Sequence, residues 1–394
     1  FCNTTSGGFT VTLPLSPAAG AVVGVSDYAK TFDTNSLTLG RNGSNIGGSA
    51  ADVSLTTEGI AVTLVYVDAT KGWIVTDSGL QSDAPIPTYI AATGGCVTTC
   101  GNFKMHKFTG PNTFVVCSVG NPAGSDTVSY MVVAGGGGGG NAYAGGGGAG
   151  GFRESKASSD CYTASPLNAT ATEGIAVSTG PYSIAVGGGG AGATVTGTVG
   201  VGGNPSSALC RTATGGGYGS AYASCAAKYT AGNGGSGGGS SGISGTAGAG
   251  IAGSGNTPPV SPPQGKDGGA GYHDNVLYAI GAGGGGATVA AINIGTSAPT
   301  VTNSPGGAGA TTEIIASPVA YAGGGGGGSH PCYPASFGSG GTGGGGAGGA
   351  VPCQSGVNGT AYTGGGGGGG GGGSGAGNGG NGGDGIVIIR YRYQ

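Results

Sequence analysis

Apolar and polar residues alternate along several short stretches in the first part of the chain. The stretch 9–13 is typical, with Phe9, Val11 and Leu13 separated by threonines. Such alternation is expected of half-buried β-strands, because every second side chain points to the same face. Turn-forming pairs such as Asn42-Gly43 separate the stretches. The pattern predicts strands at residues 9–13, 22–25, 37–39, 60–67 and 73–75.

A second group of strands is predicted at residues 103–108, 113–116 and 128–133, with a strong last strand at 386–391. No helical period competes with these strands, so the expected fold is all-β with essentially no α-helix. We expect a β-rich module at 1–78, a linker at 79–95 and a small β collar at 96–134. The C-terminal strand, 386–394, is expected to pair back onto the collar.

Residues 135–385 follow a different rule, because they hold most of the glycine. The chain has 103 glycines among 394 residues, whereas ordinary usage is about 7%. Runs such as Gly135–Gly140, Gly323–Gly328 and Gly364–Gly373 have no side chains to bury. A flexible linker is one interpretation. The other is an ordered array of polyglycine II helices, which are left-handed and have three residues per turn.

The ordered array is favoured by what separates the glycine runs. The intervening segments are apolar and aromatic, and the last run leads directly into the strand at 386–391. A polyglycine II helix has no internal hydrogen bonds, so its N–H and C=O groups need partners on neighbouring helices. Residues 135–385 are therefore predicted to form an ordered bundle of polyglycine II helices, which the resemblance described below implies to be a polyglycine II helical sandwich with receptor-binding loops.

Composition excludes several classes of function. The net charge is −3 and only 7% of residues are charged, so there is no basic surface for a nucleic acid. No apolar run reaches 18 residues, which argues against membrane insertion. The nine cysteines suit an oxidising, extracellular setting. Two loop disulfides are candidates, Cys210 with Cys225 and Cys332 with Cys353, and the odd count leaves one thiol without an intrachain partner.

No catalytic, metal or cofactor site is predicted. Matches to Gly-x-Gly-x-x-Gly are inevitable in this composition and none precedes a convincing helix. His106, His273 and His330 lie far apart in the sequence without metal-ligand spacing. Carboxylates are too sparse to nominate an acid–base pair. The sequence therefore indicates a protein that is not an enzyme.

Several phrases make the chain similar to the glycine-rich tail-fibre proteins of phages. They are 38–46 (TLGRNGSNI), 64–73 (LVYVDATKGW), 108–114 (FTGPNTF), 130–140 (YMVVAGGGGGG), 257–265 (TPPVSPPQG) and 385–391 (GIVIIRY). The resemblance implies a tail-tip adhesin in the virion, outside the cell, whose loops bind a bacterial surface protein or glycan. It also implies contacts with other tail-fibre or virion proteins. A homotrimer through residues 1–78 is a further possibility, because a small β domain gains core by association.

Three aromatic segments are candidate receptor-binding loops. Tyrosine among small polar residues gives much contact area for little lost entropy. The alternative interpretation is that these rings pack against the glycine helices and support them. The candidates are Tyr218, Tyr222 and Tyr229, then Tyr272, His273 and Tyr278, and finally His330, Tyr333 and Phe337. The competing function is a structural extracellular protein, such as a matrix or ice-binding protein, without a specific receptor.

Overall fold

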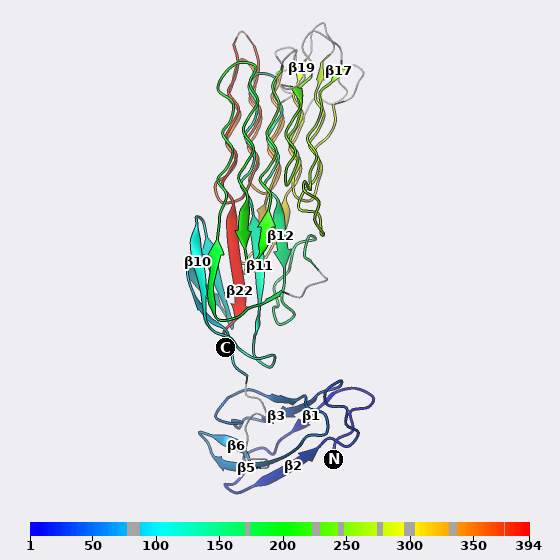
Figure 1. The fold of residues 1–394 in the computed structure, drawn as a ribbon, viewed down its shortest axis with the longest axis vertical. Helices are drawn as coiled ribbons and strands as arrows, with labels where there is room; N and C mark the ends of the chain where they lie inside the picture. The colour runs from blue at the N-terminus through cyan, green and yellow to red at the C-terminus, as the bar shows by residue number, and fades with distance from the viewer. Residues whose placement is uncertain are drawn as a thin grey trace. The chain divides into compact units, whose positions relative to one another are not determined.

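A computed structural model describes most of the chain. The described residues are 1–76, 87–169, 174–222, 229–242, 248–273, 279–294, 304–330, 337–373 and 375–394. The secondary-structure elements in this part of the chain are all β-strands, as the sequence predicted. The chain divides into two compact units (Figure 1). The first consists of 1–91, 118–126 and 392–394, and the second of 92–117 and 127–391.

The first unit contains two three-stranded sheets. One has the order β1 (Phe9–Thr12), β3 (Leu37–Gly40), β4 (Val53–Leu55), and the other β2 (Val22–Ser26), β5 (Ala61–Asp68), β6 (Gly72–Val75). Their buried faces meet in a core that includes Trp73, Phe32 and Leu39. The alternating pattern predicted five of these strands to within two residues at each end. It did not predict β4, because Val53-Ser54-Leu55 is too short to show a period.

The second unit begins with a collar of β-strands. Its main sheet has the order β12 (Phe152–Ser155), β11 (Thr127–Val133), β22 (Ile386–Arg392), β9 (Phe103–Phe108), β8 (Cys96–Cys100), with β13 (Ile175–Ala176) also on β11. Strands β11 and β22 are antiparallel, with Val133 opposite Ile386 and Ser129 opposite Arg390. The two strands that bracket the glycine-rich region therefore pair, in agreement with the prediction. Figure 1 shows β22 beside β11 at the base of the glycine runs.

A second collar sheet has the order β14 (Gly180–Ile184), β10 (Asn112–Ser118), β7 (Ala91–Thr93). Strand β7 lies inside the segment that was expected to be a linker, and residues 77–86 of that segment lie outside the described residues. The collar and the glycine-rich region belong to one unit rather than two. They are continuous because Met131, Ile386 and Ile388 pack with Ala149, Ala287 and Ala322 in one core.

A buried ion pair holds the last strand in the collar. The Nε of Arg390 donates to both carboxylate oxygens of Asp160, at 2.9 and 3.0 Å. The Ser129 hydroxyl donates to the same carboxylate at 2.9 Å, and the guanidinium lies 4.6 Å from the ring centre of Phe103. Because both charges are buried, loss of either partner would leave the other without compensation.

His106 is a second polar group buried in the collar. Its Nδ1 lies 2.6 Å from the Gly94 carbonyl oxygen and its Nε2 lies 3.0 Å from the Tyr391 hydroxyl. Burial lowers the pKa of His106, the nearby Lys104 adds to this effect, and the bond to Gly94 opposes it. Burial raises the pKa of Tyr391 to about 12. A neutral imidazole that donates from Nδ1 and accepts from Tyr391 satisfies both groups.

The glycine-rich region consists of polyglycine II helices. In the run 144–151, residues three apart donate their N–H groups to the same neighbouring run, as three residues per turn require. No glycine of this run has a positive φ, which agrees with a left-handed helix. The donor–acceptor pairs are Gly145–Ser220, Gly148–Gly217 and Gly151–Thr214, then Gly146–Ala282 and Ala149–Gly285, then Gly147–Gly367 and Gly150–Gly364.

The run 144–151 is the centre of the array. It donates to the runs that contain Ser220, Ala282 and Gly367, and it accepts from three more runs. With the donor named first, the pairs in which the central run accepts are Gly140–Gly145, Gly137–Gly148 and Ala134–Gly151, then Gly239–Gly146 and Ser236–Ala149, then Gly325–Gly147 and Gly328–Ala144. The six neighbours also bond to one another in a closed ring, for example Gly367 to Gly137 and Gly216 to Gly135. This is hexagonal packing of helices around one central helix.

Shorter outer runs cover this ring, and their burial repeats every three residues. In the outer run 377–385, Gly377, Gly380 and Gly383 are buried whereas Asn378 and Asn381 are exposed. The buried positions bond inward, as Gly380 does to Gly368 and Gly383 to Gly365. A three-residue helix turns the same face inward at every third position. The same period therefore sets which outer residues face solvent.

Close approach of the backbones leaves no space for a side chain at many positions of the array. A Cβ on Gly147 would lie 2.0 Å from the Gly137 carbonyl oxygen, and one on Gly139 would lie 2.0 Å from that of Gly368. Both distances are well below van der Waals contact. At Gly202, in an outer run, the nearest atom would be 3.4 Å away. Glycine content thus follows the packing of the array rather than a need for flexibility.

We expect Gly147→Ala to lower the free energy of unfolding by roughly 3 kcal/mol or more, because the added methyl group must displace backbone. The matched control is Gly202→Ala, expected to change it by less than about 1 kcal/mol, since the methyl group fits and the unfolded chain loses entropy. Denaturant unfolding of both variants measures the difference. Equal stability of the two variants would contradict the close-packed array.

We expect stability to fall with acid because of His106. Its pKa in the folded protein is below the unfolded value of about 6.5, so the unfolded chain binds the proton first. The contribution of His106 is present above pH 6.5 and is lost as pH falls through the folded-state pKa. His106→Gln keeps a donor and an acceptor without titrating. Unfolding measured between pH 5 and 8 should show a smaller loss in this variant, and an unchanged pH slope would refute the assignment.

Candidate functional site

The glycine helices bring several connections together at the end remote from the collar, here called the loop end. The run 134–140 leaves β11, and the chain reverses at residues 141–144 before it returns as the run 145–151. Gly145 bonds to Ser220 at 3.0 Å and Gly328 bonds to Ala144 at 2.9 Å. The segments after Ser220 and Gly328 therefore lie beside this turn. Figure 1 shows β17 (Gly248–Ala249) and β19 (Ala279–Ile280) at the same end.

Aromatic rings from four connections form one cluster at the loop end. The ring centres of Tyr143 and Tyr222 are 5.4 Å apart, and those of Tyr143 and His330 are 5.1 Å apart. His273, from β18 (Tyr272–His273), lies 5.3 Å from Tyr222. The Tyr222 hydroxyl and the His273 Nε2 are 3.1 Å apart. Aromatic pairs at these distances stabilise one another, so the four connections are held together. His273 is buried, whereas Tyr143, Tyr222 and His330 are half-buried.

Described residues from each of the three predicted loops therefore meet, although they are far apart in the sequence. Tyr222, His273 and His330 each come from a different one of them. Tyr143, which joins two of them, was missed because it stands alone in the short turn between two glycine runs. A lone aromatic residue in a turn too short to form a loop of its own is the signal that could have identified it.

Other predicted residues are divided between support and exposure. Tyr272 is buried in a small core with Ile280, Ala282 and Ile294, so it supports the glycine helices. Tyr218 is half-buried against Gly232, whose added Cβ would lie 2.5 Å from the tyrosine ring. Phe337 is 39% exposed. Tyr229 is half-buried, and Tyr278 and Tyr333 lie outside the described residues.

Each candidate disulfide has only one of its two cysteines in the described part of the chain. Cys210 and Cys353 are free thiols, and their expected partners, Cys225 and Cys332, lie outside the described residues. Both pairings require an oxidant and stay predictions. The other free thiols among the described residues belong to Cys2, Cys96, Cys100, Cys117 and Cys161.

Asparagine and aspartate side chains connect neighbouring outer helices. Each of several Oδ1 atoms accepts a hydrogen bond from a backbone N–H of the next outer run. The bonds run from Gly192 to Asn381 (2.8 Å), Gly189 to Asp384 (2.9 Å), Asn381 to Asn358 (2.8 Å), Gly255 to Asp267 (2.7 Å), Ser254 to Asn233 (2.8 Å) and Ala270 to Asn293 (2.8 Å). The sequence signal that could have predicted these bonds is the spacing of Asn378, Asn381 and Asp384, which lie three residues apart among glycines.

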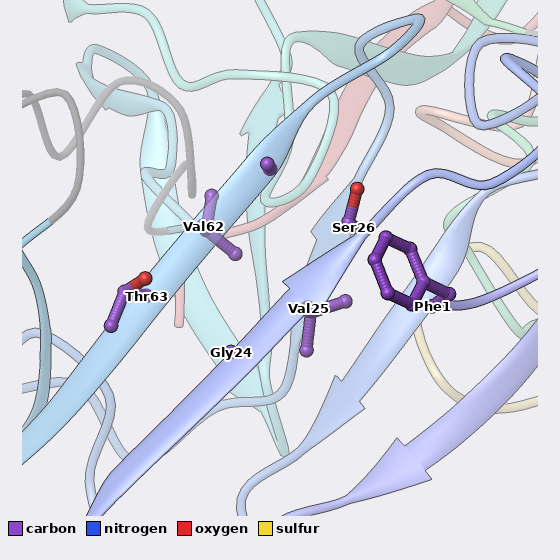
Figure 2. Close-up of a pocket in the computed structure, with 7 residues that line it drawn as sticks. Phe1, Gly24, Val25, Ser26, Val62 and Thr63 are labelled. Carbon is purple, nitrogen blue, oxygen red and sulfur yellow. The ribbon is translucent and has the colours of Figure 1, made fainter.

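The first unit has a surface pocket of about 300 Å³. Figure 2 shows Phe1 beside Val25 and Ser26 of β2, with Val62 and Thr63 of β5 opposite. The lining offers two hydroxyl groups and no charged side chain. Across the described ranges, no three His, Cys, Asp or Glu side chains are grouped as metal ligands would be. In the same ranges no helix has the length and apolarity to cross a membrane.

A family model described as a glycine-rich domain matches residues 109–392. The match covers the collar from the end of β9, all of the glycine helices and the C-terminal strand. A search of curated proteins finds none that matches the sequence.

We expect Tyr143→Ala to lower the free energy of unfolding by about 1–3 kcal/mol, because two aromatic contacts are lost. A double-mutant cycle with Tyr222→Ala should give a coupling of about 0.5–1.5 kcal/mol. The control pairs Tyr143→Ala with Tyr362→Ala, whose turn lies beside the end of β11 at the collar, and this pair should be additive. Additive effects for Tyr143 and Tyr222 would show that the rings are not coupled.

Proposed function

The chain belongs to the glycine-rich domain family, and from this premise we propose that it is the tip adhesin of a phage tail fibre. In this proposal the loop end binds a protein or glycan on the bacterial host and so attaches the virion to the cell. The first unit and the collar connect the glycine helices to other tail-fibre or virion proteins. The phrases shared with glycine-rich tail-fibre proteins motivate the identity of the assembly.

One observation carries the proposal. The sequence predicted Tyr222, His273 and His330 as binding residues of three separate loops. All three belong to one aromatic cluster at the loop end. Rigid aromatic residues with small polar neighbours are what binding loops favour. The hexagonal array supports such loops by fixing where each one begins and ends.

The composition of the connections favours recognition over a purely structural role. A matrix or ice-binding surface repeats, so its connections should repeat as well. Here the turn at residues 141–144 is short, whereas the connection between Ser220 and Tyr229 is longer and aromatic. Connections that differ in length and composition, on a regular array of helices, support a surface that is specific for one partner.

The test is adsorption of the purified full chain to a panel of candidate hosts. The labelled protein should bind the host strains and slow adsorption of the phage that carries it. Phe337 precedes Gly338, which bonds to Gly327 near the loop end. Phe337→Ala should weaken binding about tenfold or more, as truncation of an aromatic hot-spot residue does. The matched control is Tyr362→Ala, because Tyr362 is similarly exposed (45% against 39%) but lies at the collar end.

Two results would count against the proposal. Failure of the folded protein to bind any strain that adsorbs the phage would refute the adhesin function. Equal loss of binding in Phe337→Ala and Tyr362→Ala would retain the adhesin and refute the loop end as its binding surface. If the loop end is not the binding surface, exchange of residues 218–229, 272–278 and 329–337 with those of a related phage should leave host range unchanged.

A further inference from the structure

Strand β8 is an open edge of the collar sheet. It follows β9 at the end of the strand order, and β9 is its one strand partner in the described part of the chain. All five of its side chains, Cys96 to Cys100, are exposed. Edge strands are usually protected by charged residues or proline, because their free N–H and C=O groups can pair with another chain. This strand has neither, so no charge on the strand itself opposes the approach of a second copy.

The hairpin geometry shows which groups face the open edge. Strands β8 and β9 are joined by the two residues Gly101 and Asn102, with Cys100 opposite Phe103, and Gly101 has a φ of 54°. In a two-residue hairpin the residues that flank the turn form a hydrogen-bonded pair, and such pairs alternate along the ladder. Cys96, Thr98 and Cys100 therefore direct their backbone groups toward β9. Val97 and Thr99 direct theirs to the open edge.

The symmetric antiparallel register centred on Thr98 is the one that pairs all five residues of β8 with those of a second copy. In this register Val97 lies opposite Thr99 of the second copy, and these residues can exchange backbone hydrogen bonds. Cys96 lies opposite Cys100 of the second copy, and the reverse pair forms at the other end. These are non-hydrogen-bonded positions, whose Cα atoms are about 4.5 Å apart. That separation lies within the range of about 4.4–6.8 Å that a disulfide requires.

The two thiols are available for this reaction. Cys96 and Cys100 are free and exposed, and they open on a surface pocket of about 450 Å³ that Met105, Lys107 and Ile315 also line. The pocket leaves room for a small disulfide oxidant. Within one strand the two cysteines are four residues apart, or about 13 Å, which is too far for a bond between them.

We propose that β8 is a site of covalent self-association, in which two copies of the chain pair through β8 and form two disulfides between Cys96 and Cys100. Oxidised glutathione, or another low-molecular-weight disulfide, takes up the electrons. Each protein disulfide forms from two thiols and one glutathione disulfide, with release of two glutathione molecules. A five-residue strand pair buries far less than the roughly 1,200 Å² of a stable interface, so the covalent bonds hold the two copies together. The inference does not depend on the proposed function.

The experiment uses the full chain with its other seven cysteines replaced by serine. Oxidised glutathione should convert this protein into a dimer on non-reducing electrophoresis, and a reductant should reverse the change. Cys96→Ser and Cys100→Ser should each stay monomeric alone. An equal mixture of the two should give a heterodimer, because Cys100 of one variant meets Cys96 of the other. A tag on one variant distinguishes the heterodimer from either homodimer.

A second variant separates strand pairing from chance collision of exposed thiols. Val97→Pro keeps both cysteines but removes an N–H that faces the open edge, a position that tolerates proline in an edge strand. It should lower dimer yield at least tenfold while circular dichroism and elution volume stay unchanged. A dimer yield equal to that of the parent protein, from either single cysteine variant or from Val97→Pro, would overturn the proposal. The absence of a heterodimer from the mixture would overturn it too. Glutathionylated monomer as the sole product of the parent protein would do so as well.

Discussion

The structure depends on the backbone hydrogen bond between neighbouring glycine helices. Such a helix makes no bonds within itself, so each N–H and C=O must find a partner on another run. The central run 144–151 does so in six directions. Carbonyl groups such as that of Gly137 then lie so close to Gly147 that a Cβ has no space. Hydrogen bonding and glycine composition are thus two aspects of one requirement.

The pairing of β11 with β22 follows from the same requirement. The first and last glycine runs must begin and end in register, and the collar sheet provides a fixed base for both. Val133 opposite Ile386 marks the start and the end of the array, and the ion pair between Arg390 and Asp160 holds the last strand against the collar. Below the array the protein has an ordinary apolar core, whereas within it glycine backbones replace side chains.

Sequence patterns predicted the elements whose signal is local. The alternating stretches gave correct positions for β9 and β11, and the absence of side chains in the runs indicated polyglycine II helices. The neighbours of each run could not be predicted, because identical glycines carry no information about which run lies beside which. For the same reason the contact between Tyr143 and His330 was not foreseen. It depends on how runs separated by nearly two hundred residues pack together. Strand β8 was also missed, since Cys96-Val97-Thr98-Thr99-Cys100 does not alternate clearly.

The asparagine and aspartate side chains on the outer helices have a consequence for the limits of the array. A lattice of glycine helices has no intrinsic boundary, because every outer helix presents backbone groups that one more helix could use. Asn381 and Asp384 occupy the N–H groups of Gly192 and Gly189, so those groups are no longer open to another chain. These side chains resemble the charged residues that protect edge strands of β-sheets. These side chains thus limit the number of backbone donors that the outer helices offer to a further helix.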